Sequence, residues 1–290
     1  MKLKEKIISN WVWFWSTAVL AAVLLAALVI GAVVLISRWI TPEKEEFVKE
    51  DPKPVIQEEK PVYDPPEEST VKPQDFQYDG DYLTCITQPS ELGIDVSQHQ
   101  GEIDWQAVKQ AGVTFAIIRV GGRGYGEKGS LYTDDLAQTY YEGARAAGIK
   151  VGVYFFSQAI SVKEAEEEAD LVLDRIKDWQ LDMPVVYDWE QMLVAGSRTA
   201  DVDPRIVTDC MKAFCQRVEK SGRKAMIYFN PDHSDVQFFI EEVTPYGFWL
   251  AYYTEWMDYP YKVDMWQYTN EGTVPGIAGN VDINLYFPEA

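Results

Sequence analysis

Eight short apolar runs, each of strand length and rich in Val, Ile, Phe and Tyr, dominate the carboxyl-terminal two-thirds of this 290-residue chain. They lie at 93–96, 115–120, 150–156, 183–189, 224–229, 248–253, 263–268 and 281–287. Helix-like stretches separate most of the earlier runs, at 105–111, 133–147, 162–177, 204–220 and, more briefly, 234–243. A strand, a helix and a second strand form a right-handed unit of parallel sheet, so the alternation predicts an α/β fold.

The spacing of the last three runs indicates where helices are missing. Only 9 residues (254–262) and 12 residues (269–280) separate them, too few for the usual crossover helix with its loops. Eight strands favour closure into a barrel over an open sheet. The sequence therefore predicts a TIM-like (β/α) barrel with eight strands and reduced helices in its second half. Reactive groups are then expected at the carboxyl ends of the strands.

An uncharged segment at 11–36 precedes the barrel pattern. Its 26 residues would span about 39 Å as a helix, enough to cross a ~30 Å hydrocarbon core. A cleaved signal peptide is the alternative, but its apolar region would hold only about 7–15 residues. Lys2, Lys4 and Lys6 precede the segment and an acidic stretch follows it, so the positive-inside rule places residues 1–10 in the cytoplasm. The sequence thus predicts a single-pass cell-membrane protein whose later residues are extracellular.

A segment rich in proline and acidic residues follows, which we assign to 37–78. Residues 41–78 alone hold seven prolines, eleven acids and five lysines, and their apolar residues show no period. Such a composition cannot bury enough apolar surface to offset the entropy of ordering, and it favours an extended chain. We therefore expect a disordered extracellular stalk over 37–78 and a barrel domain over 79–290.

Charge and composition argue against several classes of ligand. Lys and Arg number 26 against 46 Asp and Glu, a formal net charge of −20, so no nucleic-acid surface is indicated. The Gly-rich loop at 121–126 is out of register with a dinucleotide motif, so no nucleotide or other cofactor is expected. His99 and His233 are the only histidines, and neither has a neighbouring Cys or second His, so no metal site is expected either.

Carboxylates stand at the ends of three of the apolar runs. Asp95 ends the first run (GIDVSQHQG), Asp188 and Glu190 end the fourth (VVYDWEQ), and Asp282 lies in the last (NVDINLY). Residues two apart on a strand point to the same face, so Asp188 and Glu190 serve one pocket. Such a pair suits glycoside hydrolysis, because crowding raises one pKa and lets that group act as the acid. For any single acid, helix capping or pairing with a surface basic group is the alternative.

Seven segments resemble, in order and spacing, the glycoside hydrolase family 25 muramidases, the lysozyme-like enzymes of bacteria and phages. The segments are GIDVSQHQGEIDW, FAIIRVG, KVGVYFFS, PVVYDWE, FWLAYY, DMWQYT and NVDIN, and the likeness covers about residues 93–287. The resemblance implies an eight-stranded barrel with fewer than eight helices. It also implies cleavage of the β-1,4 bond from N-acetylmuramic acid to N-acetylglucosamine in peptidoglycan.

The same resemblance implies roles for the four acids. Glu190 matches the family's general acid/base, which protonates the leaving oxygen in a reaction that retains configuration. Asp188 matches the carboxylate beside the reacting sugar. It either attacks the sugar or orients the substrate's own 2-acetamido group to attack, and the sequence leaves both routes open. Asp95 and Asp282 match the two other acids of the pocket.

Aromatic side chains near the strand ends suit a sugar-binding site, because their rings stack on the apolar faces of sugars. Most of the 12 Phe, 17 Tyr and 10 Trp must nevertheless serve the core. Phe155 departs from the resemblance, since many family members have a His after the Tyr of this segment. The candidate substrate-binding residues are Tyr154, Trp266, Tyr228, Tyr187, Trp249 and Tyr252.

Taken together, the patterns and the resemblance predict a membrane-anchored muramidase that remodels peptidoglycan close to the cell membrane. Its expected partners are peptidoglycan glycan strands and, through one N-terminal helix, the lipid bilayer. Two alternatives stay open, a wall-binding scaffold without turnover and a hydrolase of another glycan. The four intact acids argue against the scaffold, and product analysis discriminates between the glycans.

Overall fold

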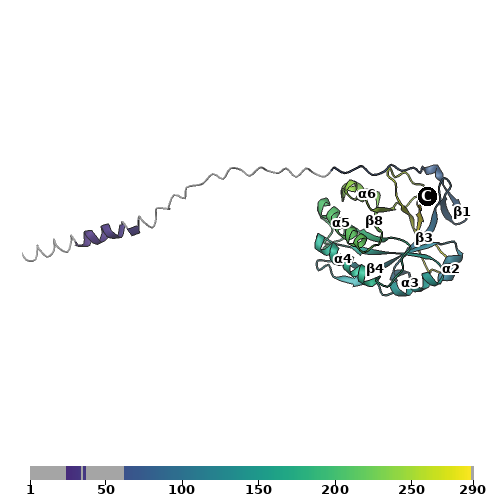
Figure 1. Ribbon diagram of the computed structural model, residues 1–290, viewed down its shortest axis with the longest axis horizontal. Helices are drawn as coiled ribbons and strands as arrows, with labels where there is room; N and C mark the ends of the chain where they lie inside the picture. The colour runs from purple at the N-terminus through teal and green to yellow at the C-terminus, as the bar shows by residue number, and fades with distance from the viewer. Residues whose placement is uncertain (1–23, 34, 37–61, 289–290) are drawn as a thin grey trace, which may run out of the picture. The chain divides into compact units, whose positions relative to one another are not determined.

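The computed structural model describes residues 24–33, 35–36 and 62–288 (Figure 1). It divides the chain into two compact units, Met1–Lys60 and Pro61–Ala290.

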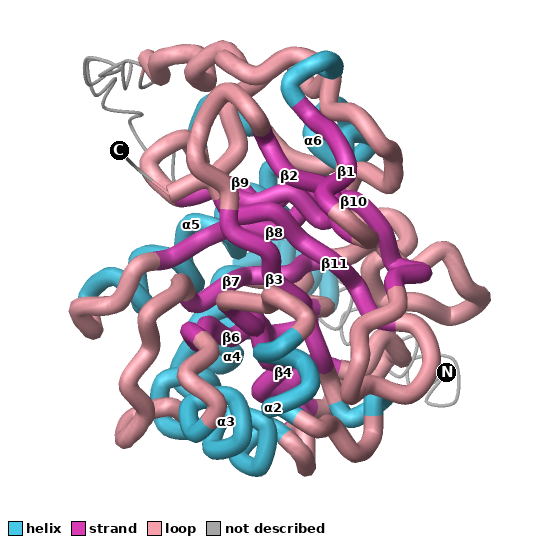
Figure 2. Tube along the Cα trace, turned by 90° about the vertical axis from the view of Figure 1, so that its right-hand side faces the viewer, coloured by secondary structure: helices cyan, strands magenta, loops and turns pink. Residues whose placement is uncertain are grey.

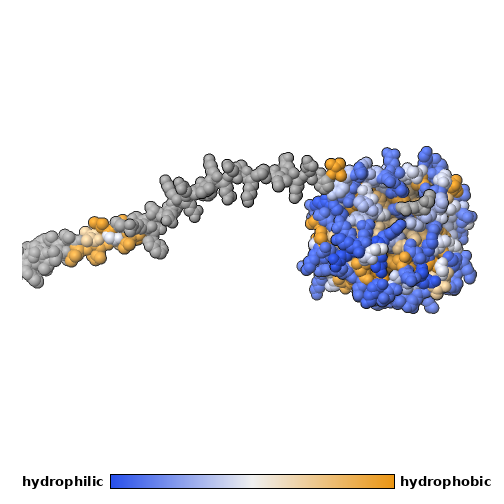
Figure 3. Space-filling view, viewed as in Figure 1, coloured by the Kyte–Doolittle hydropathy of each residue, from blue (hydrophilic) through white to orange (hydrophobic). Residues whose placement is uncertain are grey.

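In the first unit, the described residues 24–33 and 35–36 are helical, and their apolar side chains are exposed (Figure 3). The remainder of the predicted membrane span over 11–36 lies outside the described residues, as do 1–10 and 37–61. Within the ranges that the structure describes, no helix is both long enough and apolar enough to cross a membrane.

The second unit is built around a closed barrel of eight strands, which confirms the barrel predicted from the sequence. The strands are β3 (Glu91–Val96), β4 (Phe115–Arg123), β6 (Lys150–Ser157), β7 (Val185–Trp189), β8 (Ala225–Phe229), β9 (Gly247–Ala251), β10 (Met265–Gly272) and β11 (Val281–Tyr286). They pair in the order β3-β11-β10-β9-β8-β7-β6-β4, and a pairing of β3 with β4 closes the ring. A short strand, β5 (Leu131–Thr133), adds an antiparallel partner to the end of β4.

Strand β11 runs antiparallel to both of its neighbours, whereas the alternating pattern predicts a parallel sheet throughout. Only residues 273–280 join β10 to β11, and a parallel crossover needs about a dozen residues or more. The short connection therefore makes a hairpin. This reversal brings the beginning of β11 to the end of the barrel where the parallel strands finish, so Asp282 lies directly opposite Asp95 of β3.

Helices follow the earlier strands, and Figure 2 shows α2 to α5 outside the barrel strands. The helices are α2 (Trp105–Gln110), α3 (Ala137–Ala146), α4 (Val162–Arg175), α5 (Pro204–Lys220) and the short α6 (Pro231–Val236). The side chains of Asp104, Ser161 and Asp203 cap α2, α4 and α5 by accepting hydrogen bonds from backbone N–H groups. Among the described elements no helix separates β9, β10 and β11, in agreement with the predicted loss of helices from the second half.

A β-hairpin covers the part of the barrel wall that lacks helices. Its strands are β1 (Phe76–Asp79) and β2 (Tyr82–Cys85), which pair antiparallel. The Phe76 ring packs edge-on against Trp266 of β10, with ring centroids 4.9 Å apart, and against Phe287 at 6.3 Å. The hairpin thus buries apolar surface of β10 that a helix would otherwise cover.

The folded unit also begins earlier than residue 79, the boundary expected from the sequence. Within the predicted stalk, residues 62–78 are described, and they contact the barrel unit. The Ser69 amide donates to the Pro260 carbonyl, and the Lys262 amide donates to the Glu67 carbonyl, each at 2.8 Å. The composition of this segment does not reveal these contacts, because β1 has a single buried side chain and the surface on which it packs lies far away in the sequence.

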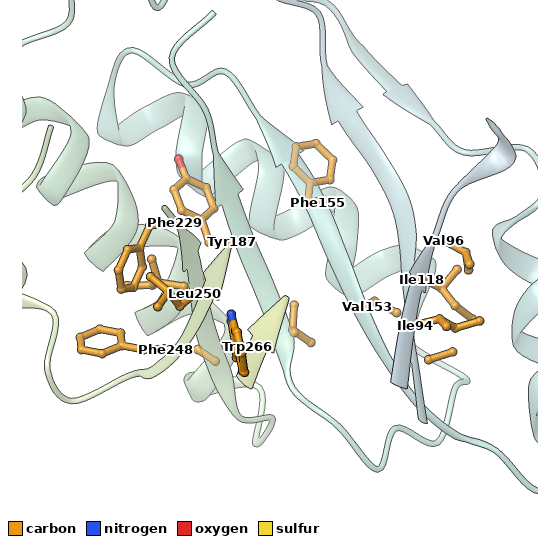
Figure 4. Packing of buried hydrophobic residues seen from close by; sticks show 14 of the residues in the cluster. Ile94, Val96, Ile118, Val153, Phe155, Tyr187, Phe229, Phe248, Leu250 and Trp266 are labelled. Atoms are coloured by element: carbon orange, nitrogen blue, oxygen red, sulfur yellow. The ribbon is translucent and has the colours of Figure 1, made fainter. Parts of the chain in front are cut away.

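Alternation along the strands sorts the core into two layers, because successive side chains point to opposite faces of the barrel wall. The inward residues fill the barrel, and the outward residues pack with the helices in a larger cluster (Figure 4). The inner layer consists of Phe115, Ile117, Met183, Val186, Met226, Trp249 and Met265. Figure 4 labels members of the outer layer, among them Ile94, Val153, Phe155, Tyr187, Leu250 and Trp266. Residues two apart on a strand share a face, and we call this shared odd or even position the residue's parity. Parity therefore decides whether a residue can reach the site inside the barrel.

Candidate active site

Four carboxylates meet at the end of the barrel where the parallel strands finish. Asp95 of β3, Asp188 of β7 and Asp282 of β11 belong to the inward-facing set, and Glu190 follows β7 with the same parity. Asp95 and Asp188 are each only 5% exposed, and Glu190 and Asp282 are half-buried. Their charges influence one another's pKa values, as expected for one cluster. The structure therefore brings together the four acids singled out from the sequence.

Two buried amides hold Asp95. Its Oδ2 accepts hydrogen bonds from Gln267 Nε2 and Asn284 Nδ2, each at 2.8 Å. Asn284 Oδ1 accepts from Trp249 Nε1 at 2.8 Å, and Gln267 Oε1 accepts from the Tyr228 hydroxyl at 2.9 Å. These outer bonds fix which end of each amide faces the carboxylate. Burial raises the pKa of Asp95 to about 6, although the two amide donors oppose the rise.

Asp188 and Glu190 are joined by a hydrogen bond between their carboxyl groups. Burial raises the pKa of both groups, more strongly that of Asp188. Their hydrogen bond further raises the pKa of Asp188 and lowers that of Glu190. The Oδ1 atom of Asp188 is buried and has no hydrogen-bond partner among the described residues. That oxygen is an acceptor open to a donor from a substrate.

Asp282 is the fourth acid of the cluster whose pKa is raised. Burial raises its pKa to about 8, and the negative charges of Asp95, its cross-strand partner, and of Glu190 add to the rise. Ionising these crowded acids opposes folding, which is the kind of arrangement found at functional sites.

Asp282→Asn is expected to stabilise the folded chain at pH 8 but not at pH 4. The pKa of Asp282 is about 8 in the folded chain, above its ordinary value of 3.8. Asp282 therefore does not destabilise the fold below pH 3.8, and the destabilisation grows as the pH rises from there to about 8. Thermal unfolding of the full chain at both pH values measures the effect. A gain in Tm of a few degrees is expected at pH 8, since about 1 kcal/mol shifts Tm by about 2–4 °C in a domain of this size.

Asp135→Asn is the control, because Asp135 is exposed and its substitution removes one negative charge without changing the four clustered acids. It is expected to leave Tm nearly unchanged at both pH values. An Asp282→Asn variant that is no more stable than the Asp135→Asn variant at pH 8 would contradict the assignment of charge crowding to this site.

Three of the candidate sugar-binding aromatics have inward parity. Tyr154 of β6 and Tyr228 of β8 lie beside the acids, and the negative charges of Asp95 and Asp188 add to the burial that raises their pKa values. Trp249 of β9 is almost fully buried, with its ring 4.8 Å from the Tyr228 ring and 6.3 Å from the Tyr154 ring. Tyr154 and Tyr228 therefore line the site, and Trp249 supports them from within the barrel.

The other three candidates lie on the outer side of the barrel wall and do not face the acids. Tyr187 is fully buried, and its ring packs at 4.6 Å against Phe214 of α5. Trp266 is also fully buried, and its Nε1 donates to the Tyr252 carbonyl at 2.8 Å. The Tyr252 ring packs against the outer cluster as well. The expectation that these three bind sugar is corrected by parity, because each neighbours an inward residue in the chain and so points the other way.

Several polar residues beside the acids were missed in the sequence. Besides Gln267 and Asn284, they include Tyr253, whose hydroxyl donates to Gln267 Oε1 at 3.0 Å. Arg119 has inward parity on β4 and forms a buried ion pair with Asp134 at 3.0 Å, and its charge lowers the pKa of Asp188. Parity was the available signal, since Asn284 lies two residues after Asp282 and Tyr253 lies two after the inward Ala251.

Across residues 24–33, 35–36 and 62–288, no group of three or more His, Cys, Asp or Glu side chains is arranged to hold a metal ion. Cys85, Cys210 and Cys215 are free and buried. Burial raises the pKa of the Cys210 thiol to about 12, so this thiol is a poor nucleophile.

The arrangement has a definite chemical capacity. A proton held between two carboxyl groups can be delivered to a leaving oxygen, and the remaining carboxylates can stabilise a positive charge that develops nearby. These are the requirements for hydrolysis of a glycosidic bond through an oxocarbenium-like transition state.

Comparison with known proteins agrees with this chemistry. The model for glycosyl hydrolases family 25 matches residues 94–277. The autolytic lysozyme of Clostridium acetobutylicum is 27% identical over 202 residues, which are 67% of this chain and 55% of that protein. Lysozyme M1 of Streptomyces globisporus is 28% identical over 205 residues, or 67% of each chain. An uncharacterized Escherichia coli K12 protein, YegX, is 30% identical over 210 residues, 67% of this chain and 68% of that one.

Solved structures share the fold. The bacterial lysozyme from Streptomyces coelicolor is 27% identical, with a TM-score of 0.56 over 69% of this chain and 93% of that one. The modular autolysin LytC from Streptococcus pneumoniae, solved in complex with a synthetic peptidoglycan ligand, has a TM-score of 0.61 at 23% identity. That match covers 68% of this chain and 47% of LytC, and it bears on the fold alone. The family match spans more than half of the residues, and the chain therefore belongs to the glycosyl hydrolases of family 25.

Proposed function

We propose that this chain is a muramidase that hydrolyses the β-1,4 bond between N-acetylmuramic acid and N-acetylglucosamine in peptidoglycan. The observation that carries the proposal is the meeting of four acids at one end of the barrel, where Oδ1 of the buried Asp188 has no hydrogen-bond partner among the described residues. Two relatives are named lysozymes, and one structure of the same fold was solved with a synthetic peptidoglycan ligand. Family membership, site chemistry and these names together support a peptidoglycan glycan strand as the substrate.

In this mechanism Glu190 is first the general acid and then the general base. The 2-acetamido N–H of the bound muramic acid donates to Oδ1 of Asp188, the buried acceptor without a partner among the described residues. That contact favours the ionised form of Asp188, so the proton moves along the existing hydrogen bond to Glu190. Glu190 then protonates the leaving glycosidic oxygen as its bond to the anomeric carbon breaks.

Retention of configuration follows from two displacements at the same carbon. The acetamido oxygen attacks the anomeric carbon from the face opposite the leaving group, and the Asp188 carboxylate stabilises the resulting cationic ring. Glu190 then takes a proton from a water molecule that attacks from the original face. Asp95, fixed by its two amide donors, supplies negative charge that stabilises the cationic transition states, and Asp282 adds to it as the pH rises toward its pKa of about 8.

The proposed test of turnover uses the full chain and purified peptidoglycan. Release of soluble fragments and new reducing ends is expected, and the same samples are centrifuged to measure protein bound to the wall. A folded protein that sediments with the wall but releases no fragments would overturn the enzymatic proposal in favour of a wall-binding scaffold.

We also propose that residues 11–36 anchor the chain in the cell membrane as a single pass, with 1–10 in the cytoplasm and the catalytic unit outside. The support is the charge-free segment, the three lysines before it and the acidic residues after it. Intact cells are treated with external protease, and their membranes are then isolated and washed with carbonate. The catalytic unit is expected to be missing from these membranes after protease treatment and present without it. A catalytic unit that external protease does not reach would contradict this topology.

A further inference from the structure

Glu190 lies one residue beyond the last residue of β7 that pairs with a neighbouring strand. The pairing of β6 with β7 ends at Ser157 and Trp189, whereas Asp188 is still paired, with Phe156 on one side and Tyr228 on the other. A side chain that follows the last pair of a ladder has no neighbouring strand to fix its backbone. Something else must therefore orient Glu190 if its carboxylate is to meet a substrate oxygen reproducibly.

Two fully buried polar side chains contact the main-chain carbonyl of Glu190. Gln158, the first residue after β6, donates from Nε2 to the Glu190 carbonyl at 2.7 Å and to the Ser157 carbonyl at 2.9 Å. Thr199 comes from the loop after β7, and its hydroxyl donates to Gln158 Oε1 at 2.9 Å. The Thr199 hydroxyl also lies 3.2 Å from the Glu190 carbonyl. Both side chains thus converge on one peptide group.

The same pair also fixes the chain just beyond Glu190. The Met192 amide donates to Thr199 Oγ1 at 3.0 Å, so the pair holds the chain at the Glu190 carbonyl and again two residues later. Every polar atom of the Gln158 amide has a partner, and a fully satisfied buried network of this kind is rigid. Neither side chain has an exposed atom to offer a ligand, since both are 0% exposed.

We propose that Gln158 and Thr199 are positioning residues that hold the Glu190 carboxylate in line with the glycosidic oxygen. This role rests on the proposed function, in which Glu190 is the acid. Removing the Thr199 hydroxyl leaves Gln158 Oε1 and the Met192 N–H without this partner, so the peptide at Glu190 loses part of what fixes its orientation, although none of the four acids is itself substituted. A misplacement of about 1 Å is enough to reduce turnover by about 10²-fold.

The test compares Thr199→Val with Thr199→Ser in the full chain. The valine variant keeps the shape but removes the hydroxyl, and its kcat on peptidoglycan is expected to fall by about 10²-fold with little change in KM. The serine variant keeps the hydroxyl and is expected to stay within a few-fold of the unmodified chain. Equal losses in both variants would overturn the proposal, because they would point to packing of the methyl group.

A matched control comes from Thr208 of α5, which is also 0% exposed. Its hydroxyl donates to the Pro204 carbonyl at 2.8 Å and accepts from the Phe239 amide at 3.0 Å. Thr208→Val therefore loses hydrogen bonds of the same kind without touching Glu190, and it is expected to lower Tm about as much as Thr199→Val while keeping kcat. A kcat that follows Tm in both valine variants would overturn the positioning role.

A second readout separates this proposal from the proposed function. Carbon-13 NMR of side-chain carboxyls in Glu-labelled chain, with the Glu190 signal identified by its absence from Glu190→Gln, is expected to show a changed titration in Thr199→Val and an unchanged one in Thr208→Val. If the chain cleaves no peptidoglycan, the proposed function fails while this comparison still decides the positioning role. An unaltered Glu190 titration in Thr199→Val would overturn that role whatever the activity.

Discussion

Replacing Glu190 with glutamine is expected to lower kcat for peptidoglycan hydrolysis by about 10³-fold, the scale of a lost general acid. Glutamine has nearly the same shape and can still accept a hydrogen bond from Asp188, so the fold and wall binding are expected to persist. It cannot protonate the leaving oxygen or take a proton from water. Fragment release from purified peptidoglycan, measured with thermal unfolding of the same samples, separates loss of chemistry from loss of structure.

The control for this variant is Glu142→Gln, on an exposed position of α3. It is expected to keep full activity. Asp188→Asn gives the discriminating comparison, because burial raises the pKa of Asp188 more strongly than that of Glu190. If Glu190→Gln keeps more than about a tenth of the activity while Asp188→Asn abolishes it, Asp188 is the acid and the assigned roles are reversed.

Phe76→Ala is expected to destabilise the barrel unit by about 3 kcal/mol, although residue 76 lies in a segment whose composition suggests a stalk. The Phe76 ring is only 9% exposed and packs on Trp266 and Phe287, so truncation leaves a cavity against β10. At about 2–4 °C for each kcal/mol, Tm is expected to fall by about 6–12 °C. Thermal and urea unfolding of the full chain measure the change.

Gln77→Ala is the matched control, since Gln77 is the next residue of β1 and is exposed. Its expected effect on stability is within about 0.5 kcal/mol, as for most exposed positions. A Phe76→Ala variant as stable as Gln77→Ala would show that the β1–β2 hairpin adds little to the fold. The folded domain would then begin near residue 79, as the composition suggests.

The barrel was predictable because strands buried on both faces read as continuous apolar runs, and the eight runs between 93 and 287 all overlap barrel strands. The direction of β11 could not be predicted from the residues of the strand, since an apolar run looks alike in either direction. Only the length of the connection at 273–280 limits it. The β1–β2 hairpin was hidden for a different reason, because its stability depends on contact between Phe76 and Trp266, which no local pattern reveals.

Asp95, Asp188 and Glu190 were predictable because they lie at or just beyond the ends of their strands and share a parity, which places them inside the barrel, whereas Asp282 lies at the start of β11 and reaches them through the reversal of that strand. The aromatics were predictable only in part. Tyr187 precedes Asp188 and Trp266 precedes Gln267, so the same alternation that turns Asp188 inward turns Tyr187 outward. The amide network around Asp95 depends on side chains from separate strands, and its bond partners emerge only once the barrel closes.

The most direct test of the central claim is the identity of the reducing ends that the full chain produces from purified peptidoglycan. Fragments are reduced with borohydride and analysed by mass spectrometry, with Glu190→Gln treated in parallel. Cleavage by the proposed muramidase predicts fragments that end in reduced N-acetylmuramic acid and that are missing from the variant. Fragments that end in reduced N-acetylglucosamine would contradict the account, because the enzyme would then cut the other glycosidic bond of the strand.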